Sequence, residues 1–476
     1  MGAFSDFITS FATIMPEVPK PIKKLSLNER LLWTAAVLVV YFVMVSIPLY
    51  GVSQGGSDIL TYSRIIFASA QGTLMELGIG PIVTAGLIVQ LLQGADIIKL
   101  DLTKSEDRAT FTASTKFATI LVALMEVSAF ILGGVFGASL TPQIIIIIMF
   151  QLFIATVIVM LMDELVQKGW GVGSGISLFI FAGAAVSIIW GILSPLPVTE
   201  VVKGVNVTSA YGLIPYLIEQ ASTSSLARLF YRSSGYPSIL TVLVTMLIIL
   251  IVVYVEGLRV EIPITSAKYR GFGGVYPIKF LYVSNIPIIL TSALLTDANF
   301  IFQFLWVRFN PQNKNSLLNL LGKFNSTTTT PTGGLAYYLT APTGLSSLIT
   351  DPVHCLFFIL LITAFCVVFA KIWVEIGGLS AEKVAKNLVD AGVQVPGFRR
   401  SEVSISQILA KYIPTLTILG GLFIGLLAGF SDLFSVLGSG IGILLMVDIG
   451  IQYYQTLVQE QMEELMPRLS GILGRS

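Results

Sequence analysis

The sequence has very few of the residues from which enzyme active sites are built. Its 476 residues include one histidine and two cysteines. They contain no GxxxxGK[ST] phosphate loop, no HExxH motif and no Cys or His cluster with metal-ligand spacing. Cys355 and Cys366 lie within one apolar run, which excludes a disulfide framework. We therefore expect neither an enzyme nor a cofactor, and a partner or a gradient must drive any work that the protein performs.

Charged residues are also scarce. They make up 12% of the chain, whereas hydrophobic residues make up 54%, and the mean hydropathy is +0.85. A soluble domain carries about a quarter of charged residues, so this composition indicates a polytopic membrane protein. The first thirty residues lack a charged start followed by an apolar stretch. We expect the targeting information to reside in the spans themselves.

Apolar runs near the length that a bilayer requires, about 20 residues, predict ten transmembrane helices in an all-α membrane protein. The ten predicted spans are residues 30–49, 76–97, 112–136, 142–163, 171–194, 238–258, 279–300, 352–375, 408–430 and 434–457. An even number of spans places both termini on the same side of the membrane.

The distribution of Lys and Arg predicts which side that is. The two tails and the connections on their side carry 21 of the 28 Lys and Arg residues. Positively charged connections stay on the cytosolic side, so both termini are predicted to be cytosolic. Asn206 and Asn325 begin N-x-[ST] patterns in the two long outer connections. These patterns agree with the orientation, but they do not establish a glycan.

The spans divide the chain into two predicted halves. The expected segments are a cytosolic amphipathic segment (1–29), a first half with spans 1–5 (30–195), an external loop and hinge region (196–237), a second half with spans 6–10 (238–457) and a cytosolic tail (458–476). The cytosolic loops of the second half are predicted at 259–278 and 376–407.

Three segments are not ordinary spans. Apolar residues from Phe4 to Met15 recur at helical spacing, which predicts an amphipathic helix on the inner membrane surface. Residues 59–74 are too short and polar to cross the membrane but too apolar for an idle loop, so we expect them in the outward cavity of the protein. Residues 310–342 are rich in Asn, Thr and Gly, which is typical of an irregular solvated loop.

Two stretches of the first half resemble two stretches of the second half. LGIGPIVTAGLIVQLL at 77–92 resembles NIPIILTSALL at 285–295, and GSGISLFI at 173–180 resembles GSGIGILL at 438–445. Helices broken by Gly or Pro at corresponding positions are typical of inverted repeats with the working site between them. The sequence therefore predicts two inverted halves of five spans with a functional site at their interface.

The four stretches bring branched apolar side chains next to small or helix-breaking residues. Ile79 and Val83 are four residues apart, as are Ile176 and Ile180. Residues at this spacing share one helix face. The residues concerned are Ile79, Val83, Ile176, Ile180, Ile289 and Leu445. If they converge at mid-membrane, they form an apolar constriction that excludes water and ions. The alternative, ordinary helix packing beside glycine, stays open on spacing alone.

Carboxylates inside spans are costly and are functional candidates by default. Glu126 lies in the middle of the third predicted span and Asp448 in the tenth. Glu126 is either a polar site lining a cavity or a buried hydrogen-bonded carboxyl, and for Asp448 we favour a structural role. Asp163, Glu164 and Glu375 lie at span ends, where we expect them to be solvated.

Several long motifs resemble the SecY family, the large (alpha) subunit of the Sec protein-conducting channel. The resemblance extends nearly from end to end, and GIGPIVTAG is more similar to archaeal than to eukaryotic members. The motifs lie at 78–92, 161–180, 276–290 (YPIKFLYVSNIPIIL), 336–342 (AYYLTAP), 351–354 (DPVH) and 411–415 (KYIPT).

The resemblance implies roles for individual residues. The family's hydrophobic pore ring falls on the six apolar residues named above. Its plug, within about 58–75, falls on Tyr62, Arg64, Ile65, Ile66, Phe67 and Leu74. Its lateral gate, between spans 2 and 3 and spans 7 and 8, falls on Thr84, Glu126 and Asn285. Glu126 replaces a neutral amide of some relatives.

The family's partners are also implied by the resemblance. The channel is expected to bind nascent secretory and membrane proteins with their signal sequences, to contact lipid, and to assemble with the small SecE (gamma) and beta subunits. The host membrane is expected to be an archaeal plasma membrane, with the endoplasmic reticulum as the alternative. Ribosome docking falls on Lys268, Arg270, Arg399 and Arg400. Basic loops suit the phosphates of ribosomal RNA, although positive-inside bias alone also places charges there.

Two other functions fit part of the pattern. An ion-coupled secondary transporter also shows inverted repeats and broken helices, but it needs a polar substrate site, and here only Glu126 is available at the interface. A purely structural membrane scaffold predicts that polar replacements at Ile79, Val83 or Ile180 leave ion leakage unchanged. The protein translocase accounts for the apolar residues at the interface best.

Overall fold

Several long helices begin at capping residues that the sequence supplies. In the computed structural model, Ser26 forms a capping box with Glu29, and Asp351 accepts a hydrogen bond from the backbone of His354 just before Pro352 begins a helix. The structure describes residues 15–472 apart from 24, 53–63, 65–66, 95–96, 99, 101–103, 134, 137–140, 203–204, 221–229, 233–235, 267–272, 326–329, 343, 391–392 and 395–401. The predicted helix at 4–15 lies almost entirely outside these residues.

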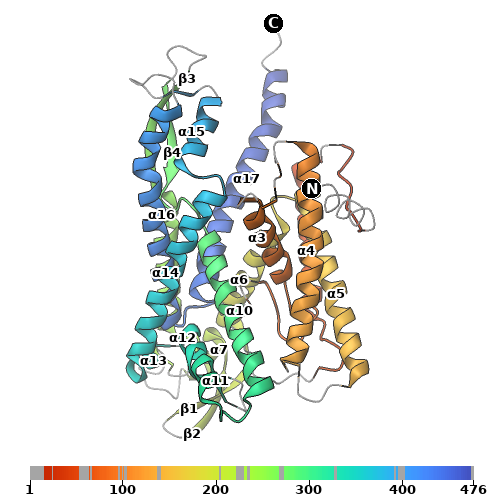
Figure 1. Ribbon diagram of the computed structural model, residues 1–476, viewed down its shortest axis with the longest axis vertical. Helices are drawn as coiled ribbons and strands as arrows, with labels where there is room; N and C mark the ends of the chain where they lie inside the picture. Colours follow the sequence, from red (N-terminus) through yellow and green to blue (C-terminus); the bar gives the residue numbers. More distant parts are fainter. Residues whose placement is uncertain are drawn as a thin grey trace.

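Helices dominate the described chain (Figure 1). The helices are α2 (Leu27–Ser46), α3 (Gly80–Gly94), α4 (Ser105–Leu132), α5 (Pro142–Leu165), η1 (Val166–Trp170), α6 (Gly175–Leu193), α7 (Leu213–Gln220), α9 (Ile239–Gly257), α10 (Ile286–Phe309), α11 (Ser316–Leu321), α12 (Leu335–Leu339), α13 (Leu345–Thr350), α14 (Pro352–Ile376), α15 (Ala381–Asp390), α16 (Glu402–Leu433) and α17 (Gly440–Ile472). The strands are β1 (Pro197–Val202), β2 (Val205–Ala210), β3 (Arg259–Ser266), β4 (Gly273–Lys279), β5 (Lys323–Phe324), β6 (Pro331–Gly333) and β7 (Val393–Gln394).

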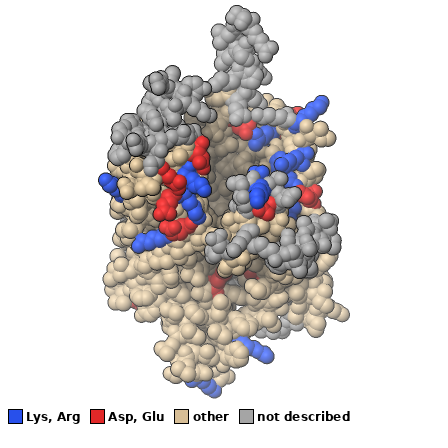
Figure 2. Space-filling view, turned by 45° about the horizontal axis from the view of Figure 1, so that its top comes forward, with Lys and Arg blue, Asp and Glu red and all other residues tan. Residues whose placement is uncertain are grey.

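Nine helices of the described chain are long and apolar enough to cross a membrane. The second predicted span, 76–97, is not among the nine: it contains α3, whose 15 residues extend only about 22 Å at 1.5 Å per residue. Large apolar side chains face outward on the long helices, for example Ile146 and Leu250, both 67% exposed. In Figure 2 charged side chains gather toward the upper part of the molecule, and the surface below is mostly uncharged. Such a surface suits lipid contact.

Three small sheets were not predicted. The cytosolic loop predicted at 259–278 contains the antiparallel hairpin of β3 and β4, and β7 pairs with the end of β3. The hairpin extends to Lys279, so α10 begins at Ile286 and not at the predicted 279. The external connection predicted at 196–237 contains the hairpin of β1 and β2. Alternating β-branched residues in both hairpins favour strands over an irregular loop.

The prediction of an irregular loop at 310–342 was wrong for much of its length. The segment contains α11, the β5–β6 pair and α12. Phe324 is 1% exposed and packs against Trp306 of α10, with ring centroids 5.4 Å apart. Two aromatic side chains bury enough apolar surface to order a connection that is polar in composition.

Glycine allows two long helices of the second half, α14 and α16, to approach closely. Gly421, Gly425 and Gly429 recur every four residues on α16, facing α14. A Cβ atom on Gly425 would lie 2.5 Å from the Cα atom of Thr363. Small residues at this spacing bring helix backbones into contact in membranes, so α14 and α16 form a tightly packed pair.

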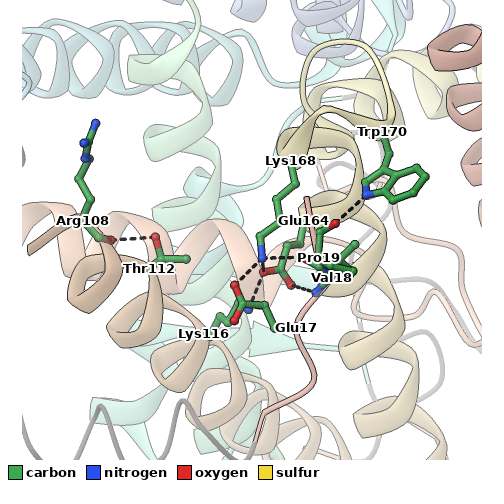
Figure 3. Close-up of polar contacts among 9 residues, drawn as sticks. All are labelled: Glu17, Val18, Pro19, Arg108, Thr112, Lys116, Glu164, Lys168 and Trp170. Carbon is green, nitrogen blue, oxygen red and sulfur yellow. Dashed lines mark hydrogen bonds and ion pairs between the residues drawn. The ribbon is translucent and has the colours of Figure 1, made fainter. Parts of the chain in front are cut away.

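A short segment before α2 lies beside α4 and the carboxyl-terminal end of α5 and forms an amino-terminal strap, residues 15–21 (Figure 3). Glu164 of α5, 9% exposed, pairs with Lys116 of α4 at 2.7 Å and with Lys168 at 2.9 Å. Lys168 also pairs with Glu17 and donates to the Val18 carbonyl at 2.6 Å. The expectation that Glu164 is solvated was wrong, because two lysines compensate its burial.

The strap should detach when Lys168 is replaced. In Lys168→Met the strap loses an ion pair and a hydrogen bond, so we expect proteolytic cleavage within residues 15–21 to accelerate about fivefold. Lys168 lowers the pKa of Glu17. The contact therefore contributes above the ordinary glutamate pKa and is lost as the pH falls through the lowered one. Lys20→Met, which changes an exposed lysine of the same strap, is the matched control. Equal cleavage of both variants would contradict the assignment.

Candidate functional site

The first pair of similar stretches has the same backbone conformation in both halves. Gly78 and Ser284 each lie three residues before the helix-starting prolines Pro81 and Pro287. Their φ angles are +56° and +53°. The left-handed conformation is uncommon for serine, and here the Ser284 hydroxyl donates to Asp448 Oδ2 at 2.7 Å. The agreement supports the internal repeat predicted from the sequence.

The second pair agrees equally well. Gly173 has φ +76° and Gly438 has φ +75°, and each lies two residues before the first residue of its helix, α6 or α17. The two helices pack against each other. Both repeat pairs therefore enter their helices through matching left-handed turns, which only glycine adopts without strain.

All six residues of the predicted ring belong to one apolar cluster between the two halves. Ile79, Ile180 and Leu445 are 0–3% exposed. Val83, Ile176 and Ile289 are partly buried and pack against the same cluster. The six side chains come from α3 and the turn before it, α6, α10 and α17. Branched apolar side chains meeting from four helices can close a passage to water and ions.

The described part of the predicted plug contacts the start of α3. Arg64, Phe67 and Leu74 are described, whereas Tyr62, Ile65 and Ile66 lie outside the described residues. Phe67 and Leu74 pack against the ring cluster, and the Phe67 carbonyl accepts from the backbone N–H of Ile79 at 2.7 Å. Residues 67–74 form turns and not a helix.

Arg64 forms a buried ion pair that the sequence analysis missed. Its Nη2 lies 2.8 Å from Glu76 Oε1, with side-chain exposures of 10% and 0%. Glu76 also accepts from the backbone N–H of Gly72. The only signal in the sequence was an acid at the edge of a predicted span, for which a buried partner is expected. The pair ties the plug region to the entrance of α3.

The predicted gate residues lie along one seam between α3 and α4 on one side and α10 and α14 on the other. Thr84 is on α3, Glu126 on α4, and Asn285, 7% exposed, immediately precedes α10. Asp297 of α10 lies close enough to Glu126 for their charges to interact. Two acidic side chains thus lie at this seam, and the choice between the two interpretations of Glu126 stays open.

Apolar contacts close the seam on either side of these two acids. Phe130 of α4 packs against Phe300 of α10 in a tilted arrangement, with ring centroids 5.1 Å apart. Toward the other end, a Cβ atom on Gly94 of α3 would lie 2.1 Å from Ile376 of α14. These contacts were not predicted, because they join residues far apart in the chain. The two walls of the seam therefore touch on both sides of the acidic pair.

The remaining predicted residues are four basic residues, which lie outside the described part of the chain, and three acids, which lie within it. Lys268, Arg270, Arg399 and Arg400 lie outside the described residues, although β3 and β4 flank the first two. Asp448 is 0% exposed and accepts from Ser284 and Gln452. Asp163 is 7% exposed, so its expected solvation was wrong, whereas Glu375 is exposed as expected. Among the described residues no group of three His, Cys, Asp or Glu side chains could hold a metal ion.

The chain matches two family models. Residues 73–454 match the SecY model, and residues 39–72 match the model of the plug domain of Sec61p. Sec61 subunit alpha of Dictyostelium discoideum is 41% identical over 99% of this chain and 98% of its own length. The SecY translocase subunit of Pyrococcus furiosus is 39% identical over 100% of both chains.

Solved structures agree with these matches. A protein-conducting channel is 36% identical, covers 96% of this chain and 98% of its own, and superimposes with a TM-score of 0.78. Sec61 in the canine ribosome-channel complex from the endoplasmic reticulum is 35% identical over the same shares, with a TM-score of 0.76. The shared sequence, the shared fold and the apolar cluster between two repeated halves lead to one conclusion: the chain belongs to the SecY family of protein-conducting channels.

Proposed function

We propose that the six apolar residues form the ring that seals the pore of a protein translocase. The observation that carries this proposal is their meeting in one cluster from four helices of both halves. A ring of Ile, Val and Leu offers no hydrogen bonds to water or ions, so it resists their passage by dewetting. Flexible aliphatic side chains can still separate around an extended polypeptide. A transporter needs polar groups at its substrate site, and the six ring residues, all Ile, Val or Leu, supply none.

Arg64, Phe67 and Leu74 belong to the plug of this channel under the same proposal. Their packing on the ring cluster and the Arg64–Glu76 pair hold the plug region against the ring. A chain entering the pore displaces this segment. Tyr62, Ile65 and Ile66 are assigned to the plug by the family resemblance alone.

The seam between α3/α4 and α10/α14 is the proposed lateral gate. Separation of Phe130 from Phe300 opens a path from the ring to lipid, and a sufficiently apolar segment then partitions into the bilayer. Thr84, Glu126 and Asn285 line this path. Glu126 of α4 and Asp297 of α10 give its two walls one acidic side chain each.

The partners of the channel follow from the same family assignment. Nascent secretory and membrane proteins enter from the cytosolic side, on which the distribution of Lys and Arg predicts both termini. The ribosome docks at the loops that contain Lys268, Arg270, Arg399 and Arg400, and SecE (gamma) and beta subunits hold the halves together. An archaeal plasma membrane is the proposed host membrane, with the endoplasmic reticulum as the alternative.

Site-specific crosslinking tests the proposal. A photoreactive residue placed at Ile180 or Ile289 should crosslink to a secretory chain stalled during translocation, because both side chains lie in the proposed ring. The matched control is Leu250 of α9, which is 67% exposed on the outer surface and should react with lipid. Absence of crosslinks from the two ring positions, with the stalled chain present in the membrane, would overturn the proposal.

A further inference from the structure

The start of α6 is held by an acid on the preceding helix. Asp163 of α5 is buried, and its Oδ1 accepts from the backbone N–H of Ile176 at 3.0 Å and from the Ser174 hydroxyl at 3.4 Å. Ser174 precedes the helix and makes no side-chain cap of its own. A carboxylate satisfies first-turn N–H groups and favours the positive end of the helix dipole. Since Ile176 belongs to the ring, Asp163 positions a ring residue through its backbone.

The start of α17 also contacts an acid of the preceding helix, and in addition the Ser439 hydroxyl accepts from the backbone N–H of Gly442 at 3.1 Å. Asp432, 8% exposed, lies near the end of the preceding helix α16, and its Oδ1 accepts from the backbone N–H of Gly440 at 3.1 Å. Gly440 is the first residue of α17, and the ring residue Leu445 follows in the second turn. Both helices that contain the GSG repeat therefore begin against an acid of the helix before them.

Close packing at the first helical residue reinforces each hydrogen bond. A Cβ atom on Gly175 would lie 2.6 Å from the Cα atom of Asp163, and one on Gly440 would lie 2.3 Å from the Cβ atom of Ser431. Neither position accommodates a side chain without displacement of the backbone. The third residue of each GSG triplet thus allows the acid to reach the helix start.

The two helix starts lie at opposite ends of one antiparallel pair. A Cβ atom on Gly173, before α6, would lie 2.9 Å from the ring of Tyr453, near the middle of α17. Gly438, before α17, lies beside Ala184 and Ile188 in the later part of α6. The two acids therefore act from opposite ends on helices that contribute to the same ring.

We propose that Asp163 and Asp432 are a matched pair of positioning residues that hold the ring-bearing ends of α6 and α17 in the sealed arrangement. The proposal rests on the ring assignment made above. Each acid acts on its own helix, so its loss loosens one part of the ring and leaves the other in place. General stabilisation of the fold would have no such selectivity.

Thiol labelling at the ring measures this selectivity. Ile176→Cys and Leu445→Cys report whether water-soluble thiol reagents reach each helix, and the native Cys355 and Cys366 are both 0% exposed. We expect Asp163→Ala to raise the labelling rate at Ile176→Cys about tenfold, the effect of losing one hydrogen bond to a charged group. Labelling at Leu445→Cys should change less than about twofold. Asp432→Ala should give the reverse.

Milder variants and a cap control keep the test decisive. Asp163→Asn and Asp432→Asn keep the acceptor but lose the charge, so we expect a rise of about threefold at the cognate cysteine. Ser238→Ala removes a buried cap, 1% exposed, from α9, which contributes no ring residue, and should change neither cysteine. The proposal is overturned if an acid variant raises the labelling rate equally at both cysteines, or if Ser238→Ala raises it. It is also overturned if every acid variant keeps the labelling rate of the parent protein. Because the assay contains no translocating chain, it is separate from the crosslinking test.

Discussion

Replacement of Gly78 by alanine is expected to leave a channel that either fails to fold or does not seal. Gly78 has φ +56°, and a Cβ atom there would lie 2.0 Å from the carbonyl oxygen of Phe67. That oxygen accepts from the backbone N–H of Ile79, a ring residue, at 2.7 Å. The alanine therefore separates the plug region from the start of α3. The left-handed conformation alone costs an L-residue about 1–2 kcal/mol, and the clash adds to it.

We expect a total loss of at least about 3 kcal/mol in the free energy of unfolding. Thermal unfolding of the purified channel measures this loss, and ion conductance in planar bilayers measures the seal. Gly86→Ala is the matched control, because it lies on α3 with no neighbouring atom within 4 Å of the added Cβ, and alanine favours helix. If the two variants unfold at the same temperature and conduct equally, the proposed closing role of the Phe67–Ile79 contact is wrong.

Neutralising Glu76 is expected to have a comparable effect. In Glu76→Gln the Arg64 guanidinium, whose side chain is 10% exposed, loses the carboxylate 2.8 Å away. Removing one partner of a buried ion pair costs about 3–5 kcal/mol, because the other charge stays buried. We expect the plug region to detach from α3, with a lower unfolding temperature and a higher conductance of the resting channel.

A double variant distinguishes the buried charge from the loss of side-chain packing. Arg64→Met with Glu76→Leu removes both charges and replaces them with apolar groups, so it should recover most of the stability that Glu76→Gln loses. Glu29→Gln, on an exposed capping box, serves as the control for loss of an acid. A double variant no more stable than Glu76→Gln would show that the pair does not act through its buried charges.

Much of the membrane architecture could be predicted because bilayers impose a simple pattern. Runs of about 20 apolar residues mark spans, and nine of the predicted runs coincide with helices of sufficient length. The repeat was also readable, since Gly78 and Gly173 mark turns whose counterparts Ser284 and Gly438 adopt the same conformation. Local chemistry determined these features.

The features that could not be predicted depend on contacts between distant residues. The partner of Arg64 lies twelve residues along the chain, and the partners of Glu164 lie on other elements. The expected solvation of Asp163 failed for the same reason, since its burial follows from the approach of α6. The hairpin of β3 and β4 escaped prediction because a search for spans treats everything between them as loop.

The crossed starts of α6 and α17 restrict how the pore widens. The turn before each helix packs against the middle of the other helix, at Tyr453 and at Ala184. Translation of one helix along its axis would therefore produce a clash at one of these two contacts and a gap at the other. Sideways tilting avoids both, so the aperture is expected to enlarge as a slot whose long direction is fixed by this helix pair.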